Sequence, residues 1–184
     1  FIDGKIFKKM VISGANNLYN HYPEVDALNV FPVPDGDTGM NMNLTMTSGM
    51  KEVVNKFDDD LYSVAKTFSK GLLMGARGNS GVITSQIFRG IADSLENKTS
   101  INAIGLAEAF DNGRKVAYKA VIKPVEGTIL TVIREASAKL LNDATEKMSI
   151  EDAFSILLEE ARESLERTPN LLPVLKEVGV VDSG

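Results

Sequence analysis

The chain has 184 residues, of which 43% are hydrophobic, which is enough for one well-buried core, so we expect a single domain over residues 1–184. The net charge of −5, with lysines and arginines spread along the chain, argues against a nucleic-acid partner or an anionic-membrane surface. The absence of cysteine excludes disulfides, thiolate metal sites and cysteine nucleophiles, and no apolar run approaches the roughly 20 residues of a membrane span. We therefore expect a cytoplasmic protein with no direct membrane insertion, and a piece of a longer multidomain chain because it begins at Phe1.

Apolar residues recur at helical spacing along most of the chain. Residues 40–53 fit a strand or a helix, and we favour a helix because no second strand is available to pair with them. Only residues 29–33 and 178–182 look extended, so the class is all-α with short connections between antiparallel neighbours. The six other predicted helices contain the apolar residues within 7–18, 61–72, 83–95, 103–121, 129–140 and 154–165.

Local signals indicate where some helices begin and end. Ser149, followed three residues later by Asp152, has the spacing of a capping box, and the helical pattern behind it stops at Pro169. The sole histidine, His21, is followed closely by Pro23, so we expect it in a surface loop rather than in a catalytic role.

The stretch NVFPVPDGDTGMNM, residues 29–42, places Asp35 and Asp37 on either side of Gly36, on a backbone stiffened by two prolines. Two carboxylates held close together repel and raise each other's pKa, a cost that a hard dication such as Mg²⁺ removes. The stretch is a candidate magnesium site. A solvated Asp-Gly turn, with Asp37 capping the next helix, is the alternative.

The stretch LLMGARGNSG, residues 72–81, lies between two helical patterns and has three glycines around Arg77. Glycine lets backbone amides at a helix N-terminus approach a phosphate, and arginine adds charge-assisted hydrogen bonds. It is not a P-loop, because no Lys-Ser or Lys-Thr follows the glycines and no strand precedes them. A flexible turn with Ser80 as N-cap is the alternative.

The stretch NLLPVLKEVGVVDSG, residues 170–184, leads through an apolar approach into a polar turn at Asp182. An aspartate there suits a ribose hydroxyl, and Lys176 suits a phosphate. An ordinary chain end is the alternative.

Together with KPVEGT at residues 123–128, these motifs resemble one family of nucleotide-binding domains over essentially the whole chain. Its two branches are the L subunit of dihydroxyacetone kinase and the N-terminal part of the bacterial fatty acid kinase catalytic subunit. The FPVPDGDTG form, GARGNSG and a terminal VVDSG are similar to the fatty acid kinase branch. Thr38 stands where the other branch has histidine, and Ser183 where it has proline.

The resemblance implies an up-and-down helical barrel of about eight antiparallel helices, with ATP or ADP and two Mg²⁺ ions in loops at one end. It implies metal ligands at Asp35 and Asp37, with Asn29 in place of a third aspartate, and a catalytic role for Arg77. It implies nucleotide contacts at Thr38, Gly39, Met40, Asn41, Ala76, Arg77, Gly78, Asn79, Ser80, Gly127, Thr128, Lys176, Asp182 and Ser183.

The chemistry so implied is phosphoryl transfer from ATP to a fatty acid carboxylate, giving an acyl phosphate. A carboxylate is ionised at pH 7 and needs no general base, only relief of charge repulsion. By the same resemblance, the reaction needs further domains of the same chain and a separate fatty-acid-binding protein. The isolated domain is expected to bind Mg·ATP or Mg·ADP but to be nearly inactive, and a homodimer is left open.

Two rival functions remain. One is the L subunit of a dihydroxyacetone kinase, in which tightly held ADP takes part in phosphotransfer to dihydroxyacetone. The more distant one is a non-enzymatic helical lipid carrier, with methionine-rich helix faces lining a cavity.

Overall fold

The computed structural model describes residues 1–184 and contains eight helices and one two-stranded sheet, which confirms the all-α class. The segment with ambiguous periodicity lies within α2, so the helical interpretation of residues 40–53 is confirmed. The elements are β1 (Ile2–Asp3), α1 (Gly4–Ala27), α2 (Thr38–Val54), α3 (Leu61–Met74), α4 (Gly78–Ser94), β2 (Ser100–Ile101), α5 (Ala103–Ala120), α6 (Ile129–Asp143), α7 (Ile150–Leu171) and α8 (Pro173–Val178).

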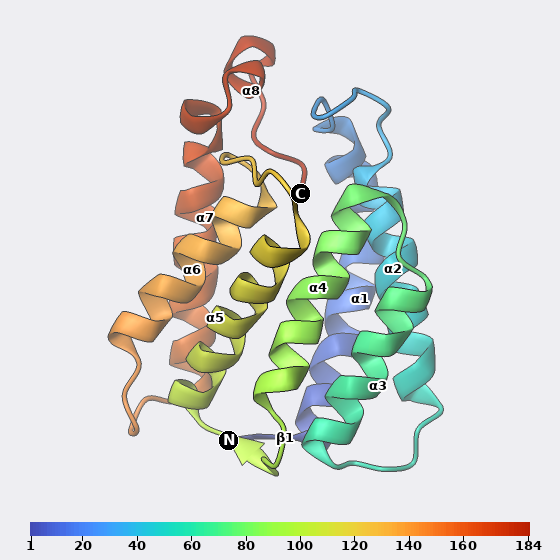
Figure 1. Cartoon of the computed structure of the whole chain (residues 1–184), viewed down its shortest axis with the longest axis vertical. Helices are drawn as coiled ribbons and strands as arrows, with labels where there is room; N and C mark the ends of the chain where they lie inside the picture. Colours follow the sequence, from blue (N-terminus) through green and yellow to red (C-terminus); the bar gives the residue numbers. More distant parts are fainter.

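The long helices run alternately up and down (Figure 1). Helices α1 to α4 pack as one group, α5 to α7 as a second, and the two groups meet along α4 and α5. The α1–α2, α3–α4 and α5–α6 connections therefore all lie at one end of the molecule, together with α8 and the C-terminus. The opposite end carries the N-terminus, the small sheet and the other connections. No helix is long and apolar enough to cross a membrane.

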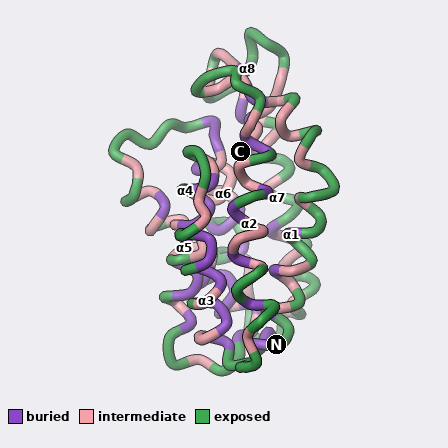
Figure 2. The backbone as a smooth tube through the Cα atoms, turned by 90° about the vertical axis from the view of Figure 1, so that its right-hand side faces the viewer, coloured by how far each residue is buried: buried purple, intermediate pink, exposed green.

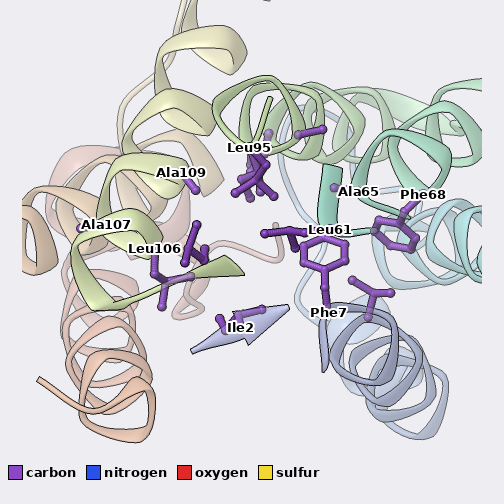
Figure 3. Packing of buried hydrophobic residues seen from close by; sticks show 14 of the residues in the cluster. Ile2, Phe7, Leu61, Ala65, Phe68, Leu95, Leu106, Ala107 and Ala109 are labelled. Atoms are coloured by element: carbon purple, nitrogen blue, oxygen red, sulfur yellow. The ribbon is translucent and has the colours of Figure 1, made fainter. Parts of the chain in front are cut away.

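The hydrophobic core runs along the axis between the helices. Buried backbone lies inside and exposed backbone covers the outer faces and the loops (Figure 2). Side chains from β1, α1, α3, α4 and α5 pack together in one hydrophobic core (Figure 3). The ring of Phe68 is fully buried and lies edge-on to Phe7 and Phe88, with centroids 6.4 and 5.0 Å away. A small apolar cavity of about 160 Å³ remains between α1, α4, α5 and α7.

Two prolines lie inside helices that the sequence predicts to end before them. Helix α1 continues through Pro23 to Ala27, so His21 lies on an exposed helical turn and not in a loop, with its Nδ1 2.8 Å from the Asn17 carbonyl oxygen. Helix α7 likewise continues through Pro169. Proline normally costs about 3 kcal/mol in a helix interior, but both lie in a final turn, where packing of neighbouring elements stabilises the helix.

Some elements have no counterpart in the sequence prediction. The β1–β2 pair is only two residues long, and Ile2 pairs with Ile101 across 99 positions, which no local pattern reveals. Helix α8 is a single short segment beginning at Pro173, and its C-cap Gly179 has a φ of +81°, typical of a glycine helix stop. Ser149 does cap α7, since its hydroxyl accepts a hydrogen bond from the Asp152 N–H at 3.0 Å, as the spacing predicts.

Candidate functional site

A cavity of about 720 Å³ opens at the end of the molecule where three loops and the C-terminus meet. The first-turn residues of three different helices line it, among them Thr38 of α2, Gly78 of α4 and Ile129 of α6. Each helix N-terminus carries about half a positive elementary charge and N–H donors that have no partner within the helix. Three such ends around one cavity form a site suited to a polyanion, and its volume is that of a small-molecule pocket, which typically spans roughly 300–1,000 Å³.

The three helix starts differ in how their backbone donors are occupied. Helix α4 begins without a side-chain cap, so the amides of Gly78, Asn79 and Ser80 remain available to a ligand, while the Gly81 N–H donates to the Arg77 carbonyl. It starts at Gly78, and Arg77 rather than Ser80 holds the N-cap position. Asp37 holds the N-cap position of α2 without a side-chain cap hydrogen bond, whereas Thr128 caps α6 by accepting from the Leu130 N–H.

Asn29 holds the start of α2 in place. Its side-chain oxygen accepts hydrogen bonds from the N–H groups of Asp37 and Thr38, at 3.0 and 3.1 Å, and its Nδ2 donates to the carbonyls of Phe31 and Val33. This buried amide therefore organises the 29–38 loop. With its oxygen directed at two backbone donors, its metal-ligand role remains a prediction.

Asp35 and Asp37 both line the cavity, separated by Gly36 with a φ of +67°. Desolvation, and then hydrogen bonding and charge from Asp37, raise the pKa of the Asp35 carboxyl above its usual range, which places the two carboxyl groups next to each other. No group of three or more carboxylates or histidines in the structure is arranged so that it could hold a metal ion by itself. The donor set therefore fits a Mg²⁺ ion that takes its remaining ligands from phosphates and water.

The glycine-rich loop between α3 and α4 is held against one face of α2. The fully buried Thr45 hydroxyl accepts a hydrogen bond from the Arg77 N–H at 3.1 Å and donates to the Asn41 carbonyl at 2.8 Å. Gly78 has a φ of +67°, and a Cβ there would lie 2.6 Å from the Asn41 Nδ2. Asn41, Thr45 and Ser48 follow one another at helical spacing, and this polar stripe on α2 is the sequence signal for the loop's docking site.

Asp182 lies in the cavity wall and is buried. Its N–H donates to the Thr168 hydroxyl at 3.1 Å, and its Oδ2 accepts from the Gly184 N–H at 3.0 Å. Burial raises the pKa of its carboxyl from 3.8 to about 6, although hydrogen bonds from Gly184 and Ile129 lower it. The terminal VVDSG is thus part of the site and not a free chain end.

The structure brings most of the predicted site residues to this one cavity, while the side chain of Arg77 is exposed and Lys176 lies on α8, both outside the lining. The roles predicted for the residues outside the lining remain predictions. The predicted residues that line the cavity are Asn29, Asp35, Asp37, Thr38, Asn41, Gly78, Asn79, Ser80, Thr128, Asp182 and Ser183. Those that do not are Gly39, Met40, Ala76, Arg77, Gly127 and Lys176.

Sequence reasoning missed much of the apolar wall and one cation. Lys123, between α5 and α6, lines the cavity, and its signal was the KPVEGT motif to which it belongs. The apolar side chains that sequence reasoning missed are Phe31, Pro32, Val33, Val82, Ile83, Ala120, Val121, Ile122, Ile129 and Leu130.

Comparison with known proteins agrees with this geometry. The model of the DAK2 domain, a nucleotide-binding domain found in kinases, matches residues 32–184, a span that contains every cavity-lining residue except Asn29 and Phe31. The chain is 61% identical over 183 residues to an uncharacterized protein of Staphylococcus saprophyticus and 57% identical to one of Staphylococcus aureus strain USA300. Each match covers 100% of this chain and 33% of the relative, so the chain spans about a third of the length of these curated relatives. The chain therefore belongs to the DAK2 domain family.

Proposed function

We propose that the cavity binds ATP with Mg²⁺, and that the longer protein to which this domain belongs transfers the terminal phosphoryl group to a fatty acid carboxylate. The observation that carries the proposal is the convergence of three helix N-termini with the adjacent Asp35 and Asp37 carboxyls on one cavity. Helix N-termini attract phosphates, and carboxylates attract the metal that accompanies them. A site built only for an anion would not carry two neighbouring carboxylates.

Each wall of the cavity then has a role. Asp35 and Asp37 hold the metal, and the uncapped first turn of α4 donates N–H groups to phosphate oxygens. The lining residues of the 29–33 and 125–130 segments surround the base, and Asp182 accepts from a ribose hydroxyl. Bound magnesium supplies neutralisation of the charge on the phosphates.

The nature of the acceptor is argued from proton balance. A carboxylate oxygen forms a bond to the terminal phosphorus as the bond from that phosphorus to the bridging oxygen breaks and ADP leaves, so no proton is transferred. A hydroxyl acceptor would need a base to take its proton. His21 lies on an exposed turn of α1 and does not line the cavity, so it is not positioned to act as that base.

The proposal includes components beyond this chain. A separate fatty-acid-binding protein presents the acyl group, and the other two thirds of a protein as long as the relatives supply further domains. In the dihydroxyacetone kinase alternative, a partner subunit supplies the base and the domain retains ADP. The domain would then carry nucleotide through gel filtration, whereas the fatty acid kinase exchanges it readily for ATP.

The small apolar cavity of about 160 Å³ between α1, α4, α5 and α7 favours a second candidate function, that of a lipid carrier. Thirteen of its 14 lining residues are hydrophobic, as a lipid carrier would require. That function predicts lipid in an organic extract of the purified protein and no nucleotide binding.

Calorimetric titration of ADP, with and without Mg²⁺, tests the proposed site. We expect magnesium-dependent binding that both Asp35→Ala and Asp37→Ala abolish, while the exposed Asp93→Ala at the other end of α4 retains it. A folded wild-type chain that produces no heat in either condition would refute nucleotide binding by this domain.

The acceptor is tested with the full-length protein and the fatty-acid-binding protein, by trapping acyl phosphate with hydroxylamine. We expect hydroxamate only when both proteins, Mg·ATP and fatty acid are present. Phosphorylation of dihydroxyacetone in place of the fatty acid would show that the protein is the dihydroxyacetone kinase of the alternative.

A further inference from the structure

Lys123 is the one cationic side chain among the residues that line the cavity. The other charged residues of the lining are Asp35, Asp37 and Asp182, all acidic. Lys123 takes part in none of the ion pairs of the structure and in none of its side-chain hydrogen bonds. An unpaired ammonium group at a cavity that otherwise carries only negative side chains is the natural partner for an anionic ligand.

The segment that carries Lys123 is fixed by a neighbour three residues away. The Glu126 carboxylate accepts hydrogen bonds from the Tyr118 hydroxyl of α5, at 3.2 Å, and from the Thr131 hydroxyl of α6, and lies 3.5 Å from the Arg134 guanidinium. Arg134 Nε also donates to the Tyr118 oxygen at 3.2 Å. Glu126 thus links the α5–α6 connection to both helices that flank it.

The same connection is closed by backbone contacts on the far side of Glu126. The Gly127 N–H donates to the Thr131 hydroxyl at 2.8 Å, and the Thr128 hydroxyl donates to the Val125 carbonyl at 2.7 Å. Gly127 has a φ of +82°, which a residue with a side chain would adopt only under strain. The connection is therefore ordered without a ligand, and Lys123 is displayed from a preorganised frame.

We propose that Lys123 contacts the phosphate chain of the bound nucleotide, and that Glu126 is a positioning residue that holds the Lys123 segment. The inference rests on the proposed nucleotide site and assigns to Lys123 the cationic role that sequence reasoning gave to Arg77. It follows from placement, because Lys123 lines the cavity whereas Arg77 does not.

The experiment measures Mg·ADP affinity by calorimetry for the wild-type chain and a set of single variants. Lys123→Met is expected to weaken binding about 10-fold or more, the effect of losing one hydrogen bond to a charged group, and Lys123→Arg to retain most of the affinity. Lys119→Met is the matched control, because Lys119, four residues before Lys123 at the end of α5, is exposed like Lys123 but does not line the cavity. Lys123→Met binding as tightly as the wild type would overturn the assignment.

A double-mutant cycle tests the positioning role. Glu126→Gln is expected to weaken Mg·ADP binding in the wild-type background and to have little further effect when Lys123 is already methionine. An equal loss in both backgrounds would overturn the positioning part, since Glu126 would then act by a route other than Lys123. Labelling with an amine-reactive ester, read by mass spectrometry, adds a direct readout in which Mg·ADP protects Lys123 but not Lys119.

The outcomes separate the inference from the proposal beneath it. If the wild-type chain fails to bind Mg·ADP, the proposed function fails. If it binds, and Lys123→Met binds equally well without protection of Lys123 in the wild type, only the further inference fails.

Discussion

Replacing Asp182 by asparagine removes a buried ionisable group while keeping its shape and an oxygen to accept the Gly184 N–H. Burial raises the pKa of this carboxyl from 3.8 to about 6, so between these values the folded chain holds a proton that the unfolded chain has released. The free energy of unfolding therefore falls as the pH rises through this window, and the loss is complete above the folded-state pKa. At about 1.36 kcal/mol per pKa unit, the full loss is about 3 kcal/mol.

The pH dependence of this loss is a sharper test than its total. At about pH 5 the wild type has lost roughly half of this free energy, so roughly half remains to be lost by about pH 8. We expect the stability of Asp182→Asn minus that of the wild type, from urea unfolding without nucleotide, to rise by about 1–2 kcal/mol from pH 5 to pH 8. Taking this difference cancels the titration of all other groups and any constant cost of the substitution.

A stability difference that is the same at both pH values, within about 0.3 kcal/mol, would contradict the reasoning, because Asp182 would then titrate alike in the folded and unfolded chains. Asp93→Asn provides the control. The Asp93 side chain is exposed on α4 and makes no hydrogen bond or ion pair, so the same substitution there reports the effect of replacing an aspartate that is not buried.

Three further substitutions probe the frame of the site. Thr45→Val leaves the Arg77 N–H without its acceptor and should lower the free energy of unfolding, measured in urea, by about 1–3 kcal/mol. Thr45→Ser keeps the hydroxyl and should recover most of this loss. An equal loss in both variants would mean that packing, and not the hydrogen bond, is responsible. Gly78→Ala imposes a positive φ on alanine and places its Cβ against Asn41. The free energy of unfolding, from thermal unfolding, should therefore fall by about 1–2 kcal/mol, and Mg·ADP should bind more weakly. Unchanged affinity would count against the close fit of this loop. Ser149→Ala removes the α7 cap at the opposite end and should cost about 1 kcal/mol in urea while Mg·ADP affinity stays the same; altered affinity would show that the two ends are coupled.

The sequence by itself determined the seven long helices, apart from some of their ends, and the identity of the special loops. Helical periodicity is a local property, because residues three and four apart share a face whatever the rest of the chain does. The segment 40–53 became α2 although its alternation also fits a strand, since no long strand exists to pair with it. The Asp35 and Asp37 loop and the glycines around Arg77 are visible in the sequence because packing alone does not require those residue types there.

Local rules failed where distant parts of the chain meet. Pro23 and Pro169 should end their helices, yet α1 continues for one more turn to Ala27, and α7 ends at Leu171 in the turn that contains Pro169. At the first of these turns the Tyr22 carbonyl packs directly against Gly39 of α2, a contact that no local pattern predicts. The β1–β2 pair is a second case, because its partners are brought together only by the folding of the helices between them.

The composition of the site was decided by tertiary structure. Sequence reasoning selected Arg77 and Lys176 as the cations, and neither lines the cavity. Helix α4 starts at Gly78 with the Arg77 backbone held by Thr45, and the Arg77 side chain remains exposed. Lys123 enters the lining because α5 and α6 place their connection beside the starts of α2 and α4. The raised pKa of Asp182 likewise depends on burial by groups distant in sequence. Residue types are local, but the direction in which a side chain points and the solvent it loses are set by how the helices pack.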